Sequence, residues 1–200
     1  MNLKKYKYCG KDTFKLEDHD PGDTGSFKSS KDVSGMLSKN VSALSEYQSK
    51  LYADGKIALL IIFQAMDAAG KDSAIKHVMS GVNPQGVDVF SFKAPSAQEL
   101  AHDYMWRAAK VLPERGKIAI FNRSYYEDVL IVKVHELYKQ QNLPDHCKDE
   151  QAMANRYRQI RHFEQHLAEN GTVIVKFFLN VSKDMQRKRF LERIDKKDKN

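Results

Sequence analysis

The sequence has little cysteine and no long apolar run, and each absence excludes a class of protein. No apolar run approaches the roughly 20 residues that a membrane-spanning helix needs, and the first residues lack the apolar core of a secretion signal. The two cysteines, Cys9 and Cys147, lie far apart with no second Cys or His at zinc-like spacing, so neither a disulfide framework nor a zinc site is indicated. We therefore expect a soluble, cytoplasmic protein with no part in a membrane.

Glycine and proline are also scarce, which argues against a disordered chain. There are 10 Gly and 5 Pro among 200 residues, and 42% of the residues are hydrophobic, enough for one globular domain with a buried core. The excess is in positive charge, with a net charge of +7. Nine basic and four acidic residues lie between Lys176 and Asn200. Such a run forms either the solvated face of a helix or a surface for a polyanion, and the run alone leaves both open.

The pattern of apolar residues divides the chain into an arm and a domain. Residues 1–34 mix Lys, Asp, Gly and Ser with no sustained period, which predicts an irregular N-terminal arm. We expect residues 35–200 to form one domain. Apolar runs of strand length predict strands at 57–63, 87–92, 117–121 and 172–179.

Helices are predicted between these strands. Helical spacing and capping residues predict helices at 37–54, 74–80, 96–113, 125–138 and 149–169, and a basic helix from residue 182. Parallel strands need crossover connections that cover the sheet. The order of elements therefore predicts a three-layer α/β/α sandwich with a central parallel sheet.

The stretch Gln64–Ser73 lies where the first predicted strand passes into a helix. Its Gly70-Lys71 pair matches the end of the phosphate-binding loop pattern, although Ala65 and Asp72 stand where the pattern has Gly and Ser or Thr. Small residues let the backbone approach phosphate oxygens, a helix start offers N–H groups, and a lysine adds positive charge. The residues expected to hold phosphate are Ala68, Ala69, Gly70, Lys71, Asp72 and Ser73. The alternative is a simple helix-starting turn, which the position between strand and helix disfavours.

Asp67 is an unusual residue for such a loop, because a carboxylate repels bound phosphate unless a cation lies between them. Its presence indicates Mg²⁺, which carboxylate oxygens bind. Asp67 would hold this metal, or help to position or deprotonate the accepting phosphate. The alternative is that Asp67 only caps the following helix.

A second polar stretch, which begins with Asn122 and Arg123, follows the third predicted strand. Ligands of parallel α/β sheets bind at the carboxyl ends of the strands, so both stretches are expected to face one crevice. Arg123 would clamp a phosphoryl group, and Glu127 or Asp128 would bind magnesium directly or through water. The alternative is an ordinary helix start, capped by Asn122 or Ser124.

Four stretches in order resemble the polyphosphate kinase 2 family, P-loop proteins related to nucleoside monophosphate kinases. They are Leu59–Asp72, His77–Gly86, Phe121–Val129 and Arg189–Ile194. The Tyr-Tyr-Glu-Asp version of the third stretch looks like the subgroup that accepts both AMP and ADP. Several long motifs in order are far more specific than a Gly-Lys pair alone.

The resemblance implies a reversible, Mg²⁺-dependent transfer of a terminal phosphoryl group from inorganic polyphosphate to ADP or AMP, with ATP or ADP as the product. It also implies a P-loop nucleotide-kinase-like fold, a basic helical lid that begins at about residue 182, and a homo-oligomer, either a dimer or a tetramer. The residues that it assigns to catalysis are Asp67, Lys71, Arg123 and Asp128. Asp67 and Asp128 would hold the metal, and Asn122, Glu127, Arg189 and Arg193 would contact phosphate or nucleotide.

The sequence departs from the family pattern in two places. Family members often have Gly where this chain has Ala65, a small change that leaves room for phosphate. The family ordinarily continues with further helix beyond the lid, whereas this sequence stops at Asn200. We therefore expect part of the lid to be absent, with slow turnover as the consequence, because lid closure excludes water and assembles the site.

Two other functions are compatible with the same features. An ATP-dependent nucleotide kinase would use the same loop. A non-catalytic protein could bind polyphosphate or nucleic acid through the basic end of the chain. The acids Asp67, Glu127 and Asp128 argue against pure binding, because they oppose a polyanion unless a metal is present. Nucleic acid is therefore not the expected partner.

Overall fold

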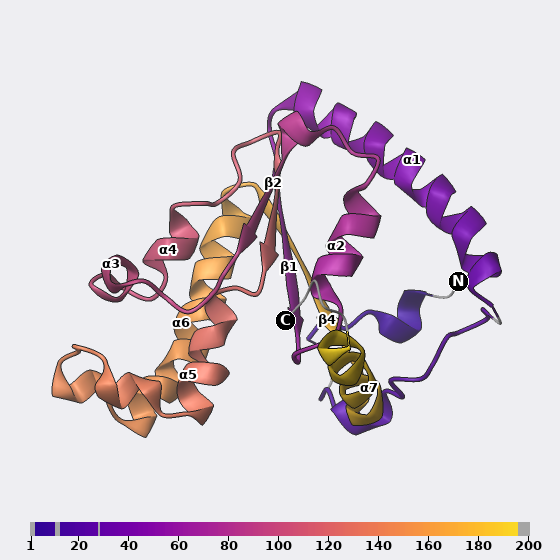
Figure 1. Cartoon of the computed structure of the whole chain (residues 1–200). Helices are drawn as coiled ribbons and strands as arrows, with labels where there is room; N and C mark the ends of the chain where they lie inside the picture. Colours follow the sequence, from indigo (N-terminus) through magenta and orange to yellow (C-terminus); the bar gives the residue numbers. More distant parts are fainter. Residues whose placement is uncertain (1–2, 11–12, 28, 196–200) are drawn as a thin grey trace.

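The computed structural model describes residues 3–10, 13–27 and 29–195 (Figure 1). Within these residues, four parallel strands form one sheet in the order β2-β3-β1-β4. The strands are β1 (Ala58–Ala65), β2 (Val87–Ser91), β3 (Ile118–Asn122) and β4 (Thr172–Leu179). All four predicted strands are thus confirmed, and the continuous apolar run in β1 is explained by its place between β3 and β4.

Helices cover both faces of the sheet, which gives the predicted three layers (Figure 1). The longer helices are α1 (Ser30–Asp54), α2 (Lys71–Met79), α6 (Glu150–Glu169) and α7 (Lys183–Ile194). On one face, Ile75 of α2 packs with Phe63 and Ile120 of the sheet. On the other, Ile160 of α6 packs with Leu60. Two separate cores, one on each face, hold the sheet in place.

The first helix begins earlier than predicted. It starts at Ser30 because Ser29 and Asp32 form a capping box, in which the Ser29 hydroxyl accepts a hydrogen bond from the Asp32 N–H at 3.3 Å. The prediction of a start at Leu37 followed the apolar residues and missed the cap. The helix ends as predicted at Gly55, whose φ is 63°.

A single helix over 96–113 was predicted, and this was wrong. The predicted capping box at Ser96 and Glu99 is present, but it begins only the short helix α3 (Ala97–Leu100). A second short helix, α4 (Trp106–Ala109), follows. The side chain of Asp103 accepts a hydrogen bond from the Met105 N–H at 2.9 Å, so a local turn replaces helical bonds between the two.

The predicted helix over 125–138 is also wrong, because the chain forms three short turns of helix. These are η4 (Tyr125–Asp128), α5 (Ile131–Val134) and η5 (Leu137–Gln140). The backbone leaves helical angles at Leu130, and Glu136 has a φ of 51°. Helical spacing of apolar residues cannot reveal such breaks.

The described residues of the N-terminal arm include the short helices η1 (Leu3–Tyr6) and η2 (Leu16–Asp18). The side-chain amide of Asn180 donates a hydrogen bond to the His19 carbonyl at 2.8 Å, which ties the arm to the segment between β4 and α7.

Two further short helices are η3 (Pro84–Gly86) and η6 (Asp145–Cys147). The end of the basic tail, residues 196–200, is outside the described residues. In the described part of the chain, no helix combines the length and apolar character that crossing a bilayer requires.

Candidate functional site

The loop between β1 and α2 has the backbone shape of an anion-binding site. Ala68 and Gly70 have φ values of 58° and 90°, in the left-handed region, which glycine adopts freely and alanine only at a steric cost. The N-cap of α2 is Gly70, which has no side chain to bond to the N–H groups of the first turn. These N–H groups and the positive end of the helix dipole are therefore available to phosphate. Because Gly70 is the N-cap, Asp67 does not cap α2.

Lys71 lies buried at the base of this loop. Its ammonium group donates hydrogen bonds to the carbonyl oxygens of Ala65 and Met66, at 3.2 and 3.4 Å. Burial lowers the pKa of Lys71 below its usual value, and the charge of Arg123 lowers it further. The lysine is thus held in place by carbonyl groups of the loop itself.

Arg123 joins the loop Gln64–Ser73 to the second motif, the polar stretch that begins with Asn122 at the end of β3. Its guanidinium lies 2.5 Å from the Asp67 carboxylate and 3.3 Å from that of Glu127. The backbone N–H of Arg123 donates to the Phe63 carbonyl at 3.0 Å, and its φ of 63° turns the chain out of β3. An arginine in the left-handed region carries a strain of roughly 1–3 kcal/mol, which is typical of functional sites. The structure therefore brings Asp67, Arg123 and Glu127 to one place.

Asn122 connects the end of β3 to the start of α2. Its buried side-chain amide donates to the Asp72 carboxylate at 2.6 Å and lies 3.5 Å from the Ser91 hydroxyl. Asn122 therefore does not act as a helix cap. That role belongs to Ser124, whose hydroxyl accepts from the Tyr126 N–H at 3.2 Å. Ser73 is exposed in the first turn of α2.

Asp128 lies elsewhere, against α6. It is buried, and its carboxylate pairs with Arg156 at 3.2 Å, while the Arg156 guanidinium lies 4.7 Å from the centroid of the Tyr104 ring. Burial raises the pKa of Asp128 to about 6, against the opposing charge of Arg156. The structure does not bring Asp128 to Asp67, so the motif spacing gave no guide to the surroundings of this acid.

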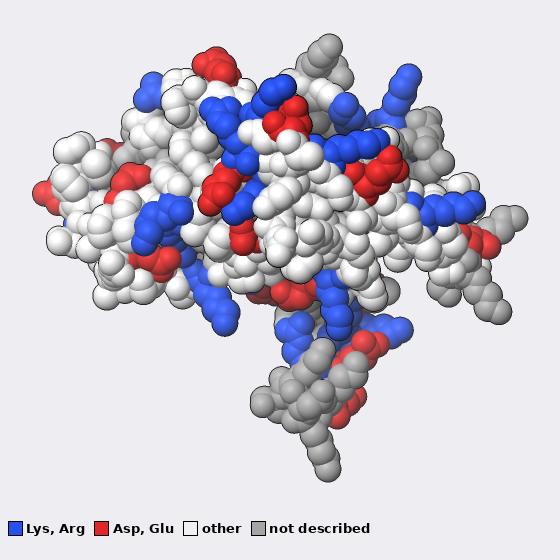
Figure 2. All heavy atoms as spheres, turned by 90° about the horizontal axis from the view of Figure 1, so that it is seen from above, with Lys and Arg blue, Asp and Glu red and all other residues white. Residues whose placement is uncertain are grey.

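The basic helix α7 contacts the loop directly. The side-chain amide of Gln186 donates to the Asp67 carbonyl at 2.7 Å, and Arg189 donates to the Ala68 carbonyl at 3.0 Å. Arg193 instead lies over the ring of Phe190, 5.8 Å from its centroid. A merely solvated helix face does not account for Arg189. Figure 2 shows Lys and Arg interspersed with Asp and Glu across the face that it presents, so that whole face is not a single basic field.

Two side chains that contribute to the site, Gln186 and Glu164, were not predicted from the sequence. Gln186 precedes Arg189 by three residues, so helical spacing could have placed both on one face. Behind the second motif, Glu164 accepts hydrogen bonds from the hydroxyls of Tyr125 and Tyr126 at 2.9 and 2.8 Å, and from Lys176 at 2.6 Å. Lys176 is a lysine within the apolar run of β4, and nothing in the sequence links it to Glu164. The network fixes the second motif to α6 and β4.

Known proteins resemble this chain along most of its length. The family model described as polyphosphate kinase 2 (PPK2) matches residues 28–200. The ADP-polyphosphate phosphotransferase of Rhodopseudomonas palustris is 58% identical over 167 residues, which are 82% of this chain and 58% of that protein. The AMP/ADP-polyphosphate phosphotransferase of Meiothermus ruber is 45% identical over 201 residues, covering 98% of this chain and 70% of that protein.

A solved structure gives the same result for the fold. The crystal structure of polyphosphate kinase 2 from Arthrobacter aurescens TC1 has a TM-score of 0.84 and 41% identity, covering 94% of this chain and 64% of that one. The chain thus spans between 58% and 70% of the length of these three relatives. Since the family model matches most of the sequence and the likeness to relatives extends along it, the chain belongs to the polyphosphate kinase 2 family.

Proposed function

We propose that this chain transfers a terminal phosphoryl group between inorganic polyphosphate and a nucleotide, with ADP or AMP as the acceptor. One observation carries the proposal. Lys71, Arg123 and Arg189 converge on a loop whose backbone suits phosphate, and Asp67 lies among them. Phosphoryl transfer needs positioning and positive charge around the transferred group, and this arrangement supplies both.

Each residue then has a defined task. The N–H groups at the start of α2 and Lys71 hold one phosphate chain in the loop. Arg123 stabilises the charge that develops on the transferred group, and Glu127 keeps its guanidinium in place. Arg189 and Gln186 bring α7 over the loop, which excludes water from the reacting atoms. Asp128 acts from a distance, by fixing η4 to Arg156 on α6.

We propose Asp67 as the protein ligand of Mg²⁺. Among the described residues no group of three His, Cys, Asp or Glu side chains could hold a metal by itself. Magnesium fits nonetheless, because it is commonly bound by one or two carboxylates together with substrate phosphates and water. The Asp67 side chain is 67% exposed beside the loop, whereas Asp128 is buried in an ion pair. When bound, the metal would neutralise charge on the phosphates.

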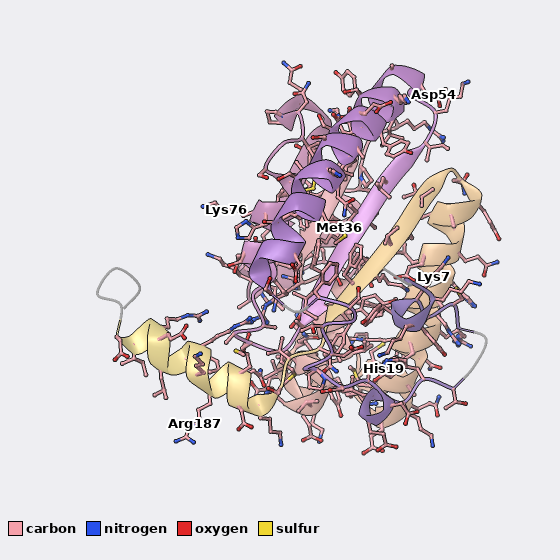
Figure 3. The ribbon with its side chains drawn as sticks, turned by 90° about the vertical axis from the view of Figure 1, so that its right-hand side faces the viewer. Lys7, His19, Met36, Asp54, Lys76 and Arg187 are labelled. Atoms are coloured by element: carbon pink, nitrogen blue, oxygen red, sulfur yellow. The ribbon has the colours of Figure 1, made fainter. Side chains whose placement is uncertain are left out.

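The proposal is tested by incubating the chain with Mg²⁺, polyphosphate and ADP or AMP, and measuring ATP or ADP. Lys71→Ala should abolish formation of the product. The matched control is Lys76→Ala, because Lys76 lies on the exposed side of the same helix (Figure 3). Equal activity of Lys71→Ala and wild type would remove the loop from its role.

The same assay separates the two other functions. Product formed with ATP as the donor and none with polyphosphate would favour an ATP-dependent nucleotide kinase. Magnesium-independent binding of polyphosphate with no turnover would favour a binding protein. Either result contradicts the proposed transfer.

We also propose that the chain forms a homo-oligomer, a dimer or a tetramer. We further propose that it functions in a reducing compartment such as the cytoplasm. Apolar side chains of the edge strand β4 are exposed, among them Val173 and Phe177, and such surfaces mark contacts between proteins. Cys9 and Cys147 are both free thiols, which suits a reducing compartment. Sedimentation equilibrium of wild type and Phe177→Ser would test the assembly.

A further inference from the structure

Glu164 of α6 accepts hydrogen bonds from three donors that belong to η4 and β4. One of its carboxylate oxygens accepts from the hydroxyls of Tyr125 and Tyr126, at 2.9 and 2.8 Å. The other accepts from the ammonium of Lys176 at 2.6 Å, and this ammonium also donates to the Tyr126 hydroxyl at 2.9 Å. The Glu164 side chain is only 13% exposed, so water offers these donors little replacement. One carboxylate therefore joins α6, η4 and β4.

The position of Glu164 requires an acceptor that carries no donor of its own. A carboxylate has two accepting oxygens, whereas an amide has one oxygen and places N–H groups where the second oxygen was. In Glu164→Gln these N–H groups would face the Lys176 ammonium, donor against donor. Burial raises the pKa of Tyr126 to about 12, so its hydroxyl keeps the proton that it donates. The contacts therefore depend on the charge of Glu164 and not on its shape alone.

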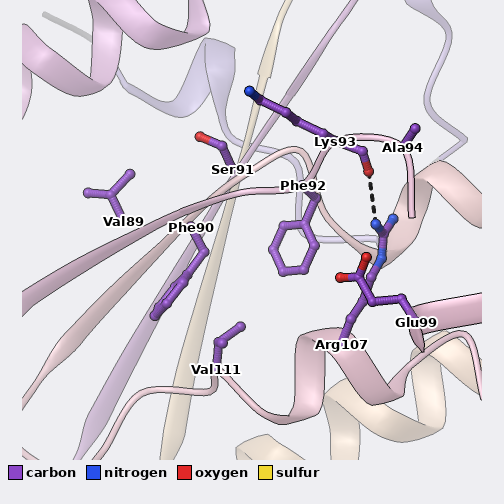
Figure 4. A pocket seen from close by; sticks show the side chains of 9 residues that line it. All are labelled: Val89, Phe90, Ser91, Phe92, Lys93, Ala94, Glu99, Arg107 and Val111. Carbon is purple, nitrogen blue, oxygen red and sulfur yellow. Dashed lines mark hydrogen bonds between the residues drawn. The ribbon is translucent and has the colours of Figure 1, made fainter. Parts of the chain in front are cut away.

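On the strand side, Arg123 is held by apolar packing. Phe121 precedes Arg123 by two residues, is fully buried, and packs edge-on against Phe92 with ring centroids 4.8 Å apart. Phe92 is held in turn by Arg107 of α4, whose guanidinium lies 5.3 Å from the centroid of its ring (Figure 4). The end of β3 therefore depends on packing and not on Glu164.

On its other side, Arg123 depends on η4. Ser124 alone separates Arg123 from Tyr125, the first residue of η4. Glu127, from the same turn, lies 3.3 Å from the Arg123 guanidinium. A single turn of 3-10 helix has few backbone hydrogen bonds of poor geometry and does not fix its own place. The contacts that η4 makes with α6 therefore decide where Arg123 and Glu127 lie.

We propose that Glu164 is a positioning residue for phosphoryl transfer, which acts through η4 on Arg123. It holds Tyr125 and Tyr126, and thereby keeps the guanidinium directed at the transferred group. The inference rests on the proposed function and adds a residue of α6 that sets its rate. Because Arg123 acts on charge that develops during transfer, its displacement lowers kcat. Lys71 and the loop still bind substrate, so KM stays near its wild-type value.

The first test measures kcat and KM of Glu164→Gln with Mg²⁺, polyphosphate and ADP or AMP. The value of kcat should fall by about tenfold or more, because a small displacement of a group aimed at the reacting atoms is costly. Both KM values should stay within about twofold of wild type. The matched control is Glu169→Gln, the same change at an exposed residue of the same helix, and it should behave as wild type.

A second substitution separates positioning from a general loss of packing. Lys176→Met removes the ammonium that would face the introduced amide, and it frees the Tyr126 hydroxyl oxygen to accept from that amide. Glu164→Gln combined with Lys176→Met should therefore recover kcat to within about threefold of wild type. A packing role predicts that two changes lose more than one. If Glu164→Gln fails to fold, Tyr126→Phe removes one hydroxyl at nearly constant volume and should lower kcat by about fivefold.

Hydrogen exchange gives a readout that needs no turnover. Backbone amides in and just after η4, among them those of Glu127 and Val129, donate to carbonyls of the same segment. Such amides exchange when the segment opens. Exchange of a peptide over residues 123–130 should be about tenfold faster in Glu164→Gln than in Glu169→Gln, with exchange in α2 unchanged.

The results separate this inference from the proposed function. If wild type transfers phosphoryl groups and Glu164→Gln keeps the kcat of its control, the function stands and the positioning role is wrong. A rise in KM at unchanged kcat, or a larger loss in the double variant than in the single one, also overturns that role. If wild type transfers no phosphoryl group, the proposed function falls and exchange decides alone. Faster exchange then shows that Glu164 holds η4 without that function, and unchanged exchange overturns the contact as well.

Discussion

Two carboxylates that belong to neighbouring motifs, Asp67 and Asp128, lie in opposite surroundings. The side chain of Asp67 is 67% exposed beside the phosphate loop and pairs with Arg123. The side chain of Asp128 is 8% exposed and pairs with Arg156 behind the site. An acid that must exchange a protein partner for a metal or substrate has to be reachable, whereas a buried acid keeps its one partner because separating them is costly. From this difference we propose that Asp67 takes part in the chemistry and that Asp128 stabilises the structure around the site.

The largest expected effect is on catalysis at Asp67. Asp67→Asn should lower the rate of phosphoryl transfer by a factor on the order of 10²–10³, because a charged group aimed at the reacting phosphates is lost. Its thermal midpoint should stay near that of wild type, since the side chain is exposed. Steady-state kinetics and calorimetry measure the two quantities, with the exposed Asp88→Asn as control. An equal rate loss in Asp128→Asn at unchanged stability would contradict the different roles of the two acids.

A large effect on stability is expected at Arg156. Arg156→Met should lower the free energy of unfolding by about 3 kcal/mol, because it leaves Asp128 buried without its charge partner. Urea unfolding at pH 8 measures this. Arg158→Met is the control, since Arg158 is exposed on the same helix and its loss should cost no more than about 0.5 kcal/mol. Equal stability of the two variants would contradict the structural role of Asp128.

The stability of the protein should depend on pH through Asp128. Its pKa is raised from 3.8 to about 6, so between these values the folded state holds the proton more tightly than the unfolded state. Stability should therefore fall as pH rises through this range, by about 2–3 kcal/mol relative to Asp128→Asn, and change no further above it. The charged neighbours that face this acid are Arg156, Arg107, Asp103 and Glu127. A difference that grows with rising pH would mean that Arg156 outweighs burial.

The smallest expected effect separates two arginines of α7. Arg189→Ala should lower kcat/KM for polyphosphate by about tenfold, since it loses a charged contact at the loop. Arg193→Ala should change it by about two- to threefold, because Arg193 lies over Phe190, away from the loop, and acts only through its charge. Equal effects would show that α7 works as a diffuse basic surface.

Much of the fold followed from local pattern. The four strands, the cap of α6 at Asp149 and that of α7 at Ser182 each depend on residues within one or two turns, so they could be predicted. The breaks at Leu130 and Glu136 could not, because they depend on how the short helices η4, α5 and η5 pack against one another.

The candidate site was predictable to a similar extent. That Lys71 and Arg123 lie near the same edge of the sheet could be predicted, because strand ends in a parallel sheet meet at one edge. The pairing of Asp128 with Arg156 joins residues 28 positions apart on different elements. No spacing within either motif carries that information.

The sequence by itself determined the parallel sheet, the phosphate loop and the family, because strand period, small residues and ordered motifs are local properties of the chain. The tertiary structure decided which charged groups meet. It placed Arg123 between Asp67 and Glu127, buried Asp128 against Arg156, and brought Arg189 to the Ala68 carbonyl. The reason is physical: the pKa and partner of a charged side chain depend on burial and on groups distant in sequence.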